Sequence, residues 1–147
     1  MLADELLKEE KLLRSRLVPN VLKSLYDKGL AKVRVRREEI ISFVALWPTK
    51  QRSWYELGTL WVHPDDRKKN ISSQVFTECL DDNKEKNIFL ITRSIKVVHL
   101  ARVHEMEEST AWHTDPFWVK LCEPWDELPS QGTRVLPKEG RLFYRKV

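Results

Sequence analysis

The sequence predicts an α/β domain in which a sheet is flanked by helices, and three observations lead to this prediction. Segments with helix and strand patterns follow one another in the order helix, helix, three strands, helix, strand, helix. A length of 147 residues with 41% hydrophobic residues suits one domain with a sizeable core, spanning residues 1–147. The clearest stretch, residues 55–76, has the order strand, tight loop and helix start.

Two helices and two strands are expected before this stretch. Pro19 suits the first turn of the second helix, and Gly29 suits its C-cap. Residues 31–36 alternate valine with charged residues, as in a half-exposed strand, and a turn leads to a more apolar strand at 40–47. The first helix is amphipathic, with leucines at helical spacing: Leu2, Leu6, Leu7, Leu13 and Leu17.

The central strand is predicted at residues 55–62, which are rich in aromatic and β-branched residues. His63 and Pro64 end it, and we expect His63 to serve only the turn. Gly58 inside the strand indicates either a bulge or the close approach of a ligand.

A helix is predicted next, at residues 73–86, with Ser72 or Ser73 as its N-cap. The first N–H groups of a helix have no acceptor within it, so its N-terminus attracts anions, and neighbouring cations add to the attraction. The sequence therefore predicts a phosphate or pyrophosphate site at this point. The loop before the helix holds three consecutive cations: Arg67, Lys68 and Lys69.

The C-terminal part begins with a buried strand at 88–92 and a helix that carries Ile95, Val98 and Val103. A Pro-rich stretch at 123–140 precedes a final strand at 141–147. Aromatic side chains before that stretch could line an acceptor pocket, but such clusters are more often core or dimer contacts, which we prefer. These aromatic residues are Trp112, Phe117, Trp118 and Trp125.

The composition restricts the class of ligand and the setting. A formal net charge of +4 and a pI near 9.1 mildly favour anionic ligands, and Arg34, Arg36 and Arg37 form a second basic cluster. Arginines on alternate strand positions are more often a solvated face than a nucleic-acid track. No apolar run reaches bilayer length and the first residues lack a secretion signal, so we expect a cytoplasmic protein.

The two cysteines point to no metal and no disulfide. Cys79 lies on the predicted helix and Cys122 in an apolar, strand-like run, without metal-ligand spacing between them. We expect two buried, reduced thiols.

The segment Glu-Leu-Gly-Thr-Leu-Trp-Val-His-Pro-Asp-Asp-Arg-Lys-Lys-Asn-Ile-Ser, residues 56–72, resembles the central motif of the GNAT superfamily of N-acetyltransferases. In that family a strand ending in Val-x-Pro is followed by Arg/Gln-x-x-Gly-x-Gly/Ala and a helix. Arg67 stands at the Arg/Gln position, while Asn70 and Ser72 replace the two glycines. Asn tolerates left-handed backbone and Ser is small, so the loop geometry can survive.

The resemblance implies a mixed, mostly antiparallel sheet flanked by helices. The family opens with a strand that this chain lacks, so one sheet edge is expected to be bare or covered by another segment or a second copy. Acetyl-coenzyme A is the implied cofactor, with its pantetheine arm along the backbone of Leu60, Trp61 and Val62. The loop amides would hold its pyrophosphate, through residues Arg67, Lys68, Lys69, Asn70, Ile71, Ser72 and Ser73.

Two residues are candidates for the chemistry. The resemblance implies that Glu56 is the general base, and strand parity predicts that it shares a face with Val62. Its alternative is an outward-facing strand glutamate paired with a neighbouring cation. His104 stands where the family has a tyrosine that acts as the acid, and the alternative is a helix-surface histidine without a catalytic role.

The implied activity is direct transfer of an acetyl group from acetyl-coenzyme A to a primary amine of a small molecule or a protein. One alternative is a non-catalytic domain of the same fold that binds acyl-coenzyme A or a partner. Another is a basic nucleic-acid-associated module built around the arginine strand.

Overall fold

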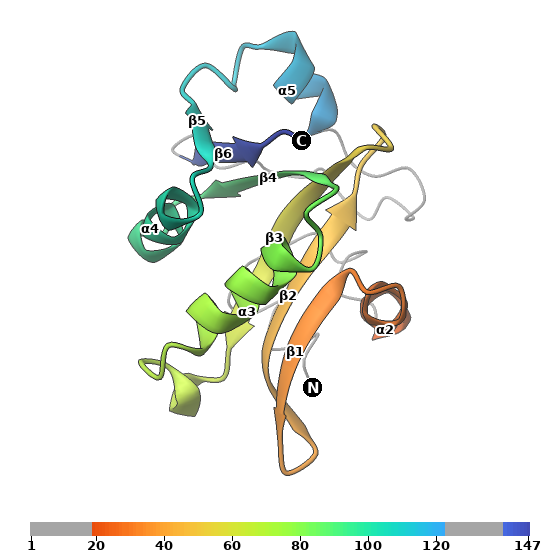
Figure 1. The fold of residues 1–147 in the computed structure, drawn as a ribbon, viewed down its shortest axis with the longest axis vertical. Helices are drawn as coiled ribbons and strands as arrows, with labels where there is room; N and C mark the ends of the chain where they lie inside the picture. Colours follow the sequence, from red (N-terminus) through yellow and green to blue (C-terminus); the bar gives the residue numbers. More distant parts are fainter. Residues whose placement is uncertain (1–18, 123–139) are drawn as a thin grey trace.

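The computed structural model describes residues 19–122 and 140–147, which form one six-stranded sheet with helices packed on it (Figure 1). The strand order is β1-β2-β3-β4-β6-β5, and every neighbouring pair is antiparallel except β3 and β4. The predicted mixed, mostly antiparallel sheet is therefore confirmed. The strands are β1 Ala31–Arg36, β2 Glu39–Pro48, β3 Trp54–Val62, β4 Asn87–Thr92, β5 Glu107–Ser109 and β6 Arg141–Arg145. The helices are α2 Pro19–Asp27, α3 Ile71–Asp81, α4 Ile95–Val103 and α5 Pro116–Leu121, with a 3-10 turn η2 at Pro64–Asp66.

The predicted elements from Pro19 to the central strand are confirmed. Helix α2 begins at Pro19, and Gly29 follows its end with a φ of 74°, the left-handed backbone that a glycine C-cap supplies. The turn between β1 and β2 has positive φ at both central residues, Arg37 and Glu38, as the twist of a two-residue hairpin requires. Within the described residues the outer edge of β1 has no strand partner. The predicted leucine-rich N-terminal helix and most of the Pro-rich stretch lie outside the described residues, so both remain predictions.

Helix α3 differs from its prediction at both ends. It begins at Ile71 because Asn70 takes the N-cap position, so neither Ser72 nor Ser73 is the cap. It ends at Asp81 rather than near residue 86, because the Asn83 side chain donates to the carbonyl of Cys79 at 2.8 Å and so closes the helix.

The aromatic-rich stretch before residue 122 is a helix rather than a strand-like run. Asp115 accepts a hydrogen bond from Phe117 N–H and Pro116 occupies the first helical position, so these two residues start α5. Cys122 is its C-cap. The strand that closes the sheet beside β6 is the three-residue β5 instead.

The aromatic residues mainly form core, as preferred above. Trp112 and Trp118 are buried with Trp54 and Phe89 beneath α5, whereas Phe117 is exposed. Trp125 lies outside the described residues. The expectation of two buried thiols is also confirmed, and burial raises the pKa of Cys79 to about 12, so that thiol stays neutral.

The basic residues of β1 are not a solvated face. Lys32 Nζ lies 2.5 Å from Asp82 at the end of α3, and Arg34 forms a bidentate pair with Glu78 in the middle of that helix. Alternate residues of β1 therefore point toward α3.

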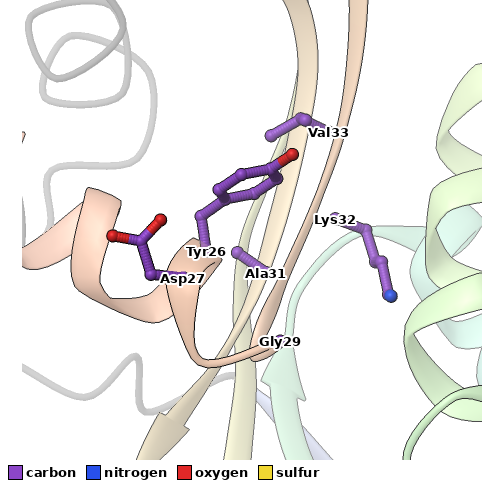
Figure 2. A pocket seen from close by; sticks show the side chains of 6 residues that line it. All are labelled: Tyr26, Asp27, Gly29, Ala31, Lys32 and Val33. Carbon is purple, nitrogen blue, oxygen red and sulfur yellow. The ribbon is translucent and has the colours of Figure 1, made fainter.

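The other face of β1 is covered by α2. Figure 2 shows Tyr26, Ala31 and Val33 on one side of the strand and the Lys32 side chain on the other, pointing toward α3. Helices α2 and α3 therefore cover opposite faces of the sheet. No helix in the described part of the chain is long and apolar enough to cross a membrane.

Arg145 ties the last strand to the end of α3. Its guanidinium donates to the carbonyls of Asn83 at 2.8 Å, Lys86 at 3.3 Å and Leu80 at 3.4 Å. Leu80 lies in the last turn of α3, and Asn83 and Lys86 follow the end of the helix, so the guanidinium supplies donors to carbonyls near the helix C-terminus.

We expect Arg145→Ala to lower the free energy of unfolding by about 2 kcal/mol, because partly buried carbonyls lose a charged donor. The measurement is chemical denaturation followed by circular dichroism. The matched control is Lys146→Ala at the adjacent exposed position, where the change should stay within about 0.5 kcal/mol. Equal effects of the two substitutions would contradict the assignment.

Candidate functional site

A β-bulge interrupts the central strand β3. Phe43 of β2 pairs with Trp61 and Ala45 pairs with Gly58, so Thr59 and Leu60 together lie opposite one β2 residue. Thr59 has a φ of 56°, and its hydroxyl donates to the Gly58 carbonyl at 2.6 Å. The bulge that Gly58 indicated is therefore present. The residue with left-handed backbone is Thr59 and not Gly58.

Trp47 supports the bulge from β2. Its indole N–H donates to Thr59 Oγ1 at 3.3 Å, and its ring would lie 3.6 Å from a Cβ atom placed on Gly58. The indole is completely buried. A buried side chain thus holds the unusual backbone of Thr59 in place.

The bulge overturns the predicted parity of Glu56 and Val62. Val62 pairs with Ser42, which pairs with Arg34 on the α3 face. Glu56 pairs with Trp47 on the opposite face. The extra residue in the bulge shifts the alternation by one, so side chains six positions apart no longer share a face.

Strands β3 and β4 separate next to the bulge. Their parallel pairing covers only Trp54 with Asn87, Tyr55 with Ile88 and Glu56 with Phe89. Beyond Glu56, β3 continues to Val62 and β4 to Thr92, but the two strands no longer pair with each other. Figure 1 shows them diverging.

The separation leaves one edge of β3 available. Within the described residues, the edge of residues 57–62 that faces β4 has no strand partner. This edge includes Leu60, Trp61 and Val62, the residues expected to pair with a pantetheine arm. Extended ligands with amide groups commonly bind to such an edge. The Val62 carbonyl itself already accepts a hydrogen bond from Arg67 Nε at 3.0 Å.

The loop at residues 63–70 follows β3 and has left-handed backbone at two positions. Lys68 has a φ of 70° and Asn70 a φ of 62°. Asn70 thus adopts at the first glycine position the backbone predicted for it. Ser72, at the second, lies in the first turn of α3 and is 6% exposed, so this position requires a small side chain. His63 serves the turn, as predicted, because its Nδ1 accepts from Asp65 N–H at 3.1 Å.

Within the described part of the chain, the N-terminus of α3 presents donors without an intrahelical acceptor. The Asn70 carbonyl accepts from Gln74 N–H at 3.3 Å, so the N–H groups of Ile71, Ser72 and Ser73 have no acceptor within the helix. The Asn70 side chain makes no capping hydrogen bond to them. The hydroxyl of Ser72 is also buried and has no hydrogen-bond partner among the residues that the structure describes. These donors fit an anion with several oxygen atoms.

The cations of this loop are partly committed to internal contacts. Lys69 Nζ lies 3.2 Å from Asp66 Oδ1, and Arg36 forms a bidentate pair with the same carboxylate. Hydrogen bonds from Arg36, and then from Lys69, hold the pKa of Asp66 below its usual value. Because Arg36 is ion-paired within the chain, the arginine cluster is less suited to a nucleic-acid track than its sequence suggests.

Glu56 is buried, not outward-facing. It is 5% exposed and belongs to the last paired position before β3 and β4 separate. The side chain therefore lies at the point where the two strands begin to diverge, on the sheet face opposite α3.

His104 is more than a surface residue of α4. It is the C-cap of the helix, and its Nε2 lies 2.9 Å from Thr77 Oγ1 of α3. Its ring also packs against Phe76, with the ring centres 5.5 Å apart. His104 thus joins the end of α4 to α3.

Sequence reasoning assigned no role to Thr59 or Asp66, and it indicated Arg36 only as part of a basic cluster. A signal for the bulge was present in Gly58, but it gave no indication of which residue would take the left-handed backbone. For Asp66 the signal was an acidic residue directly before three cations. Its partner Arg36 is 30 residues away in the sequence, so only the tertiary structure brings the two together.

The sequence matches no protein-family model and no curated protein. Solved structures do resemble it. An acetyltransferase of the GNAT family from Staphylococcus aureus has 11% identity and a TM-score of 0.62, over 98% of this chain and 89% of that chain. Ribosomal-protein-alanine N-acetyltransferase from Brucella melitensis has 14% identity and a TM-score of 0.60, over 97% of this chain and 86% of that chain.

Diaminobutyrate acetyltransferase from Paenibacillus lautus, solved with L-2,4-diaminobutyric acid and coenzyme A, has 13% identity and a TM-score of 0.56. That match covers 95% of this chain and 84% of that chain. The chain spans only 39% and 36% of two longer proteins, from Pyrococcus horikoshii and Thermoplasma acidophilum, described as acetyltransferases. The sheet topology and these similarities together show that the chain has the fold of the GNAT acetyltransferases.

Proposed function

We propose that this chain is an N-acetyltransferase that moves an acetyl group from acetyl-coenzyme A to a primary amine of a small molecule or protein. The observation that carries the proposal is the juxtaposition of two binding features. Within the described residues, the edge of β3 without a strand partner leads through the loop at residues 63–70 to the N–H groups at the start of α3, which have no acceptor within the helix. A diphosphate joined to an amide-containing arm suits both features at once.

The residues present fit coenzyme A. The buried Ser72 hydroxyl and the N–H groups of Ile71 and Ser73 would hold the diphosphate. Lys68, which is exposed, would add positive charge beside it. The backbone of residues 60–62 would pair with the pantetheine arm. The similar diaminobutyrate acetyltransferase was crystallised with coenzyme A, which supports this choice of ligand.

Glu56 would act as the general base. Acetyl-coenzyme A supplies the acetyl thioester, and the acceptor amine must be neutral to attack its carbonyl carbon. Glu56 would take the proton that the amine loses as the new C–N bond forms, directly or through water. Its position where β3 and β4 begin to separate would set it beside the reacting groups, so that orientation supplies much of the rate enhancement.

His104 would protonate the departing thiolate as the C–S bond breaks. His104 lies against α3, on the sheet face opposite Glu56. This role therefore requires the imidazole to exchange its contact with Thr77 for one with the sulfur, on the other side of the thioester from Glu56. The same contact favours a second candidate function, a non-catalytic domain that binds acyl-coenzyme A or a partner. In that case His104 would serve only to join α4 to α3.

The acceptor would be a primary amine. The diaminobutyrate acetyltransferase from Paenibacillus lautus was solved with an amine substrate, L-2,4-diaminobutyric acid, which makes diamines and amino acids a suitable first panel. A second copy covering the free edge of β1 is a further proposal, and sedimentation velocity would test it.

Coenzyme A binding depends on the left-handed backbone at Asn70, and a matched pair of variants tests this. Asn70→Gly should bind coenzyme A at least as well as the wild type, because glycine adopts a φ of 62° without strain. Asn70→Val should bind about tenfold more weakly, because a β-branched residue disfavours that backbone by roughly 1–2 kcal/mol. Isothermal titration with coenzyme A measures both. No binding by the wild-type protein would refute the proposed function.

Glu56→Gln should lower turnover by roughly a hundredfold or more while leaving the coenzyme A Kd unchanged, because the amide cannot accept a proton. The assay follows release of free thiol from acetyl-coenzyme A across the amine panel, with isothermal titration alongside. Glu38→Gln, at an exposed acidic position in the turn between β1 and β2, is the control and should keep full turnover. Unchanged turnover in Glu56→Gln would remove Glu56 from the mechanism, and absence of turnover in the wild type with binding intact would favour the non-catalytic candidate.

A further inference from the structure

A fully buried carboxylate stands inside the loop that precedes α3. Asp66 has no exposed surface, although it lies between exposed residues. Arg36 donates to both of its oxygens, with Nη2 at 2.8 Å from Oδ2. Lys69 approaches Oδ1 at 3.2 Å. The carboxylate of Asp66 therefore connects Arg36, at the end of β1, with Lys69, three residues further along the loop.

The contacts of Asp66 compensate for an unfavourable backbone. A charge without partners is costly to bury, and here two cations satisfy the carboxylate. Lys68 and Asn70 both adopt left-handed backbone, which costs free energy for residues other than glycine. The loop therefore needs an external restraint to stay in this conformation, and the ion pairs of the buried Asp66 carboxylate with Arg36 and Lys69 supply one.

Asp66 is unsuited to contact a diphosphate itself, because a carboxylate repels an anion. Its effect is on the shape of the loop and on the placing of Lys69. Hydrogen bonds from Arg36 and Lys69 favour its ionised form, so the restraint persists at neutral pH.

We propose that Asp66, through Arg36 and Lys69, is a positioning residue that holds the loop at residues 63–70 in the conformation that accepts the diphosphate of coenzyme A. This inference rests on the proposed function. A loop with glycines adopts left-handed backbone at little cost. In this loop residues other than glycine adopt that backbone, and the contacts of Asp66 stabilise it instead. When the restraint is removed, the binding-competent conformation becomes a smaller fraction of the population, and the apparent Kd rises by the inverse of that fraction.

The chain contains a matched control for this pair. Arg34 lies two residues before Arg36 on the same strand and forms a similar bidentate pair with Glu78. Glu78 belongs to the middle of α3 and not to the loop. Removing either carboxylate breaks one ion pair with a β1 arginine, and removing Asp66 also breaks its contact with Lys69. Of the two acids, only Asp66 lies in the loop at the diphosphate site.

The test compares Asp66→Asn with Glu78→Gln. Asp66→Asn should raise the Kd for coenzyme A about tenfold, corresponding to a loop that is competent in roughly one molecule in ten. Glu78→Gln should stay within about twofold of the wild type. Isothermal titration with coenzyme A measures both, and thermal unfolding checks that each variant is folded. If Asp66→Asn does not fold, Arg36→Gln replaces it, with the same expected rise in Kd.

A second readout separates positioning from general damage to the fold. S-acetylpantetheine carries the acetyl thioester and the amide arm but no diphosphate. Relative to wild type, Asp66→Asn should lower kcat/KM with acetyl-coenzyme A by about tenfold, mainly through KM, and leave kcat/KM with S-acetylpantetheine unchanged. The amine acceptor is the one that gives the highest turnover in the panel.

The outcomes are distinguishable. Wild-type protein that binds no coenzyme A would overturn the proposed function and this inference together. Wild-type binding with an unchanged Kd in Asp66→Asn would overturn the inference alone. An equal loss of kcat/KM with both donors would do the same, because it would mean general structural damage. A loss confined to the donor with the diphosphate supports the positioning role.

Discussion

The bulge at Thr59 and Leu60 is the constraint on which the architecture of the site depends. Because β3 carries one extra residue, its strand twists away from β4 after the pair Glu56 and Phe89. Two consequences follow from this one feature. The backbone edge beyond Glu56 loses its strand partner, and the side chains on either side of the bulge point to opposite faces. The buried indole of Trp47 maintains the bulge, so a core residue decides the geometry of the sheet edge.

Ion pairs give the second layer of organisation. Three cations on alternate positions of β1 contact acids in or near α3: Lys32 with Asp82, Arg34 with Glu78 and Arg36 with Asp66. The first two are partly exposed, and pairs of that kind contribute little to stability individually. Their common effect is directional, because they set how α3 and the loop before it lie over the sheet. The third pair differs because its carboxylate is completely buried.

The comparisons with solved structures support the fold of this chain, whereas the proposed chemistry is supported by its own residues. Identities of 11% to 14% with solved acetyltransferases establish a shared architecture, and a fold of this kind carries many functions. Acetyl transfer is therefore proposed from features of this chain itself. These are the N–H donors at the start of α3 without an intrahelical acceptor, the separated strands and a buried glutamate where the separation begins. The replacement of glycine by Asn70 and Ser72 is compatible with that proposal, because each position keeps the property that its backbone or packing requires.

Much of the fold could be predicted from the sequence alone. Local patterns determined the strands and helices from Pro19 to Val103, with boundary errors in α3, because alternation and helical periodicity depend only on neighbouring residues. The left-handed Asn70 was also predictable, since it follows from the conformational preference of one residue. The tertiary structure alone decided the face of Glu56, the partners of the arginines and the burial of Asp66. Each of these depends on contacts between distant segments, and a single inserted residue in a strand is enough to reverse the face that alternation predicts.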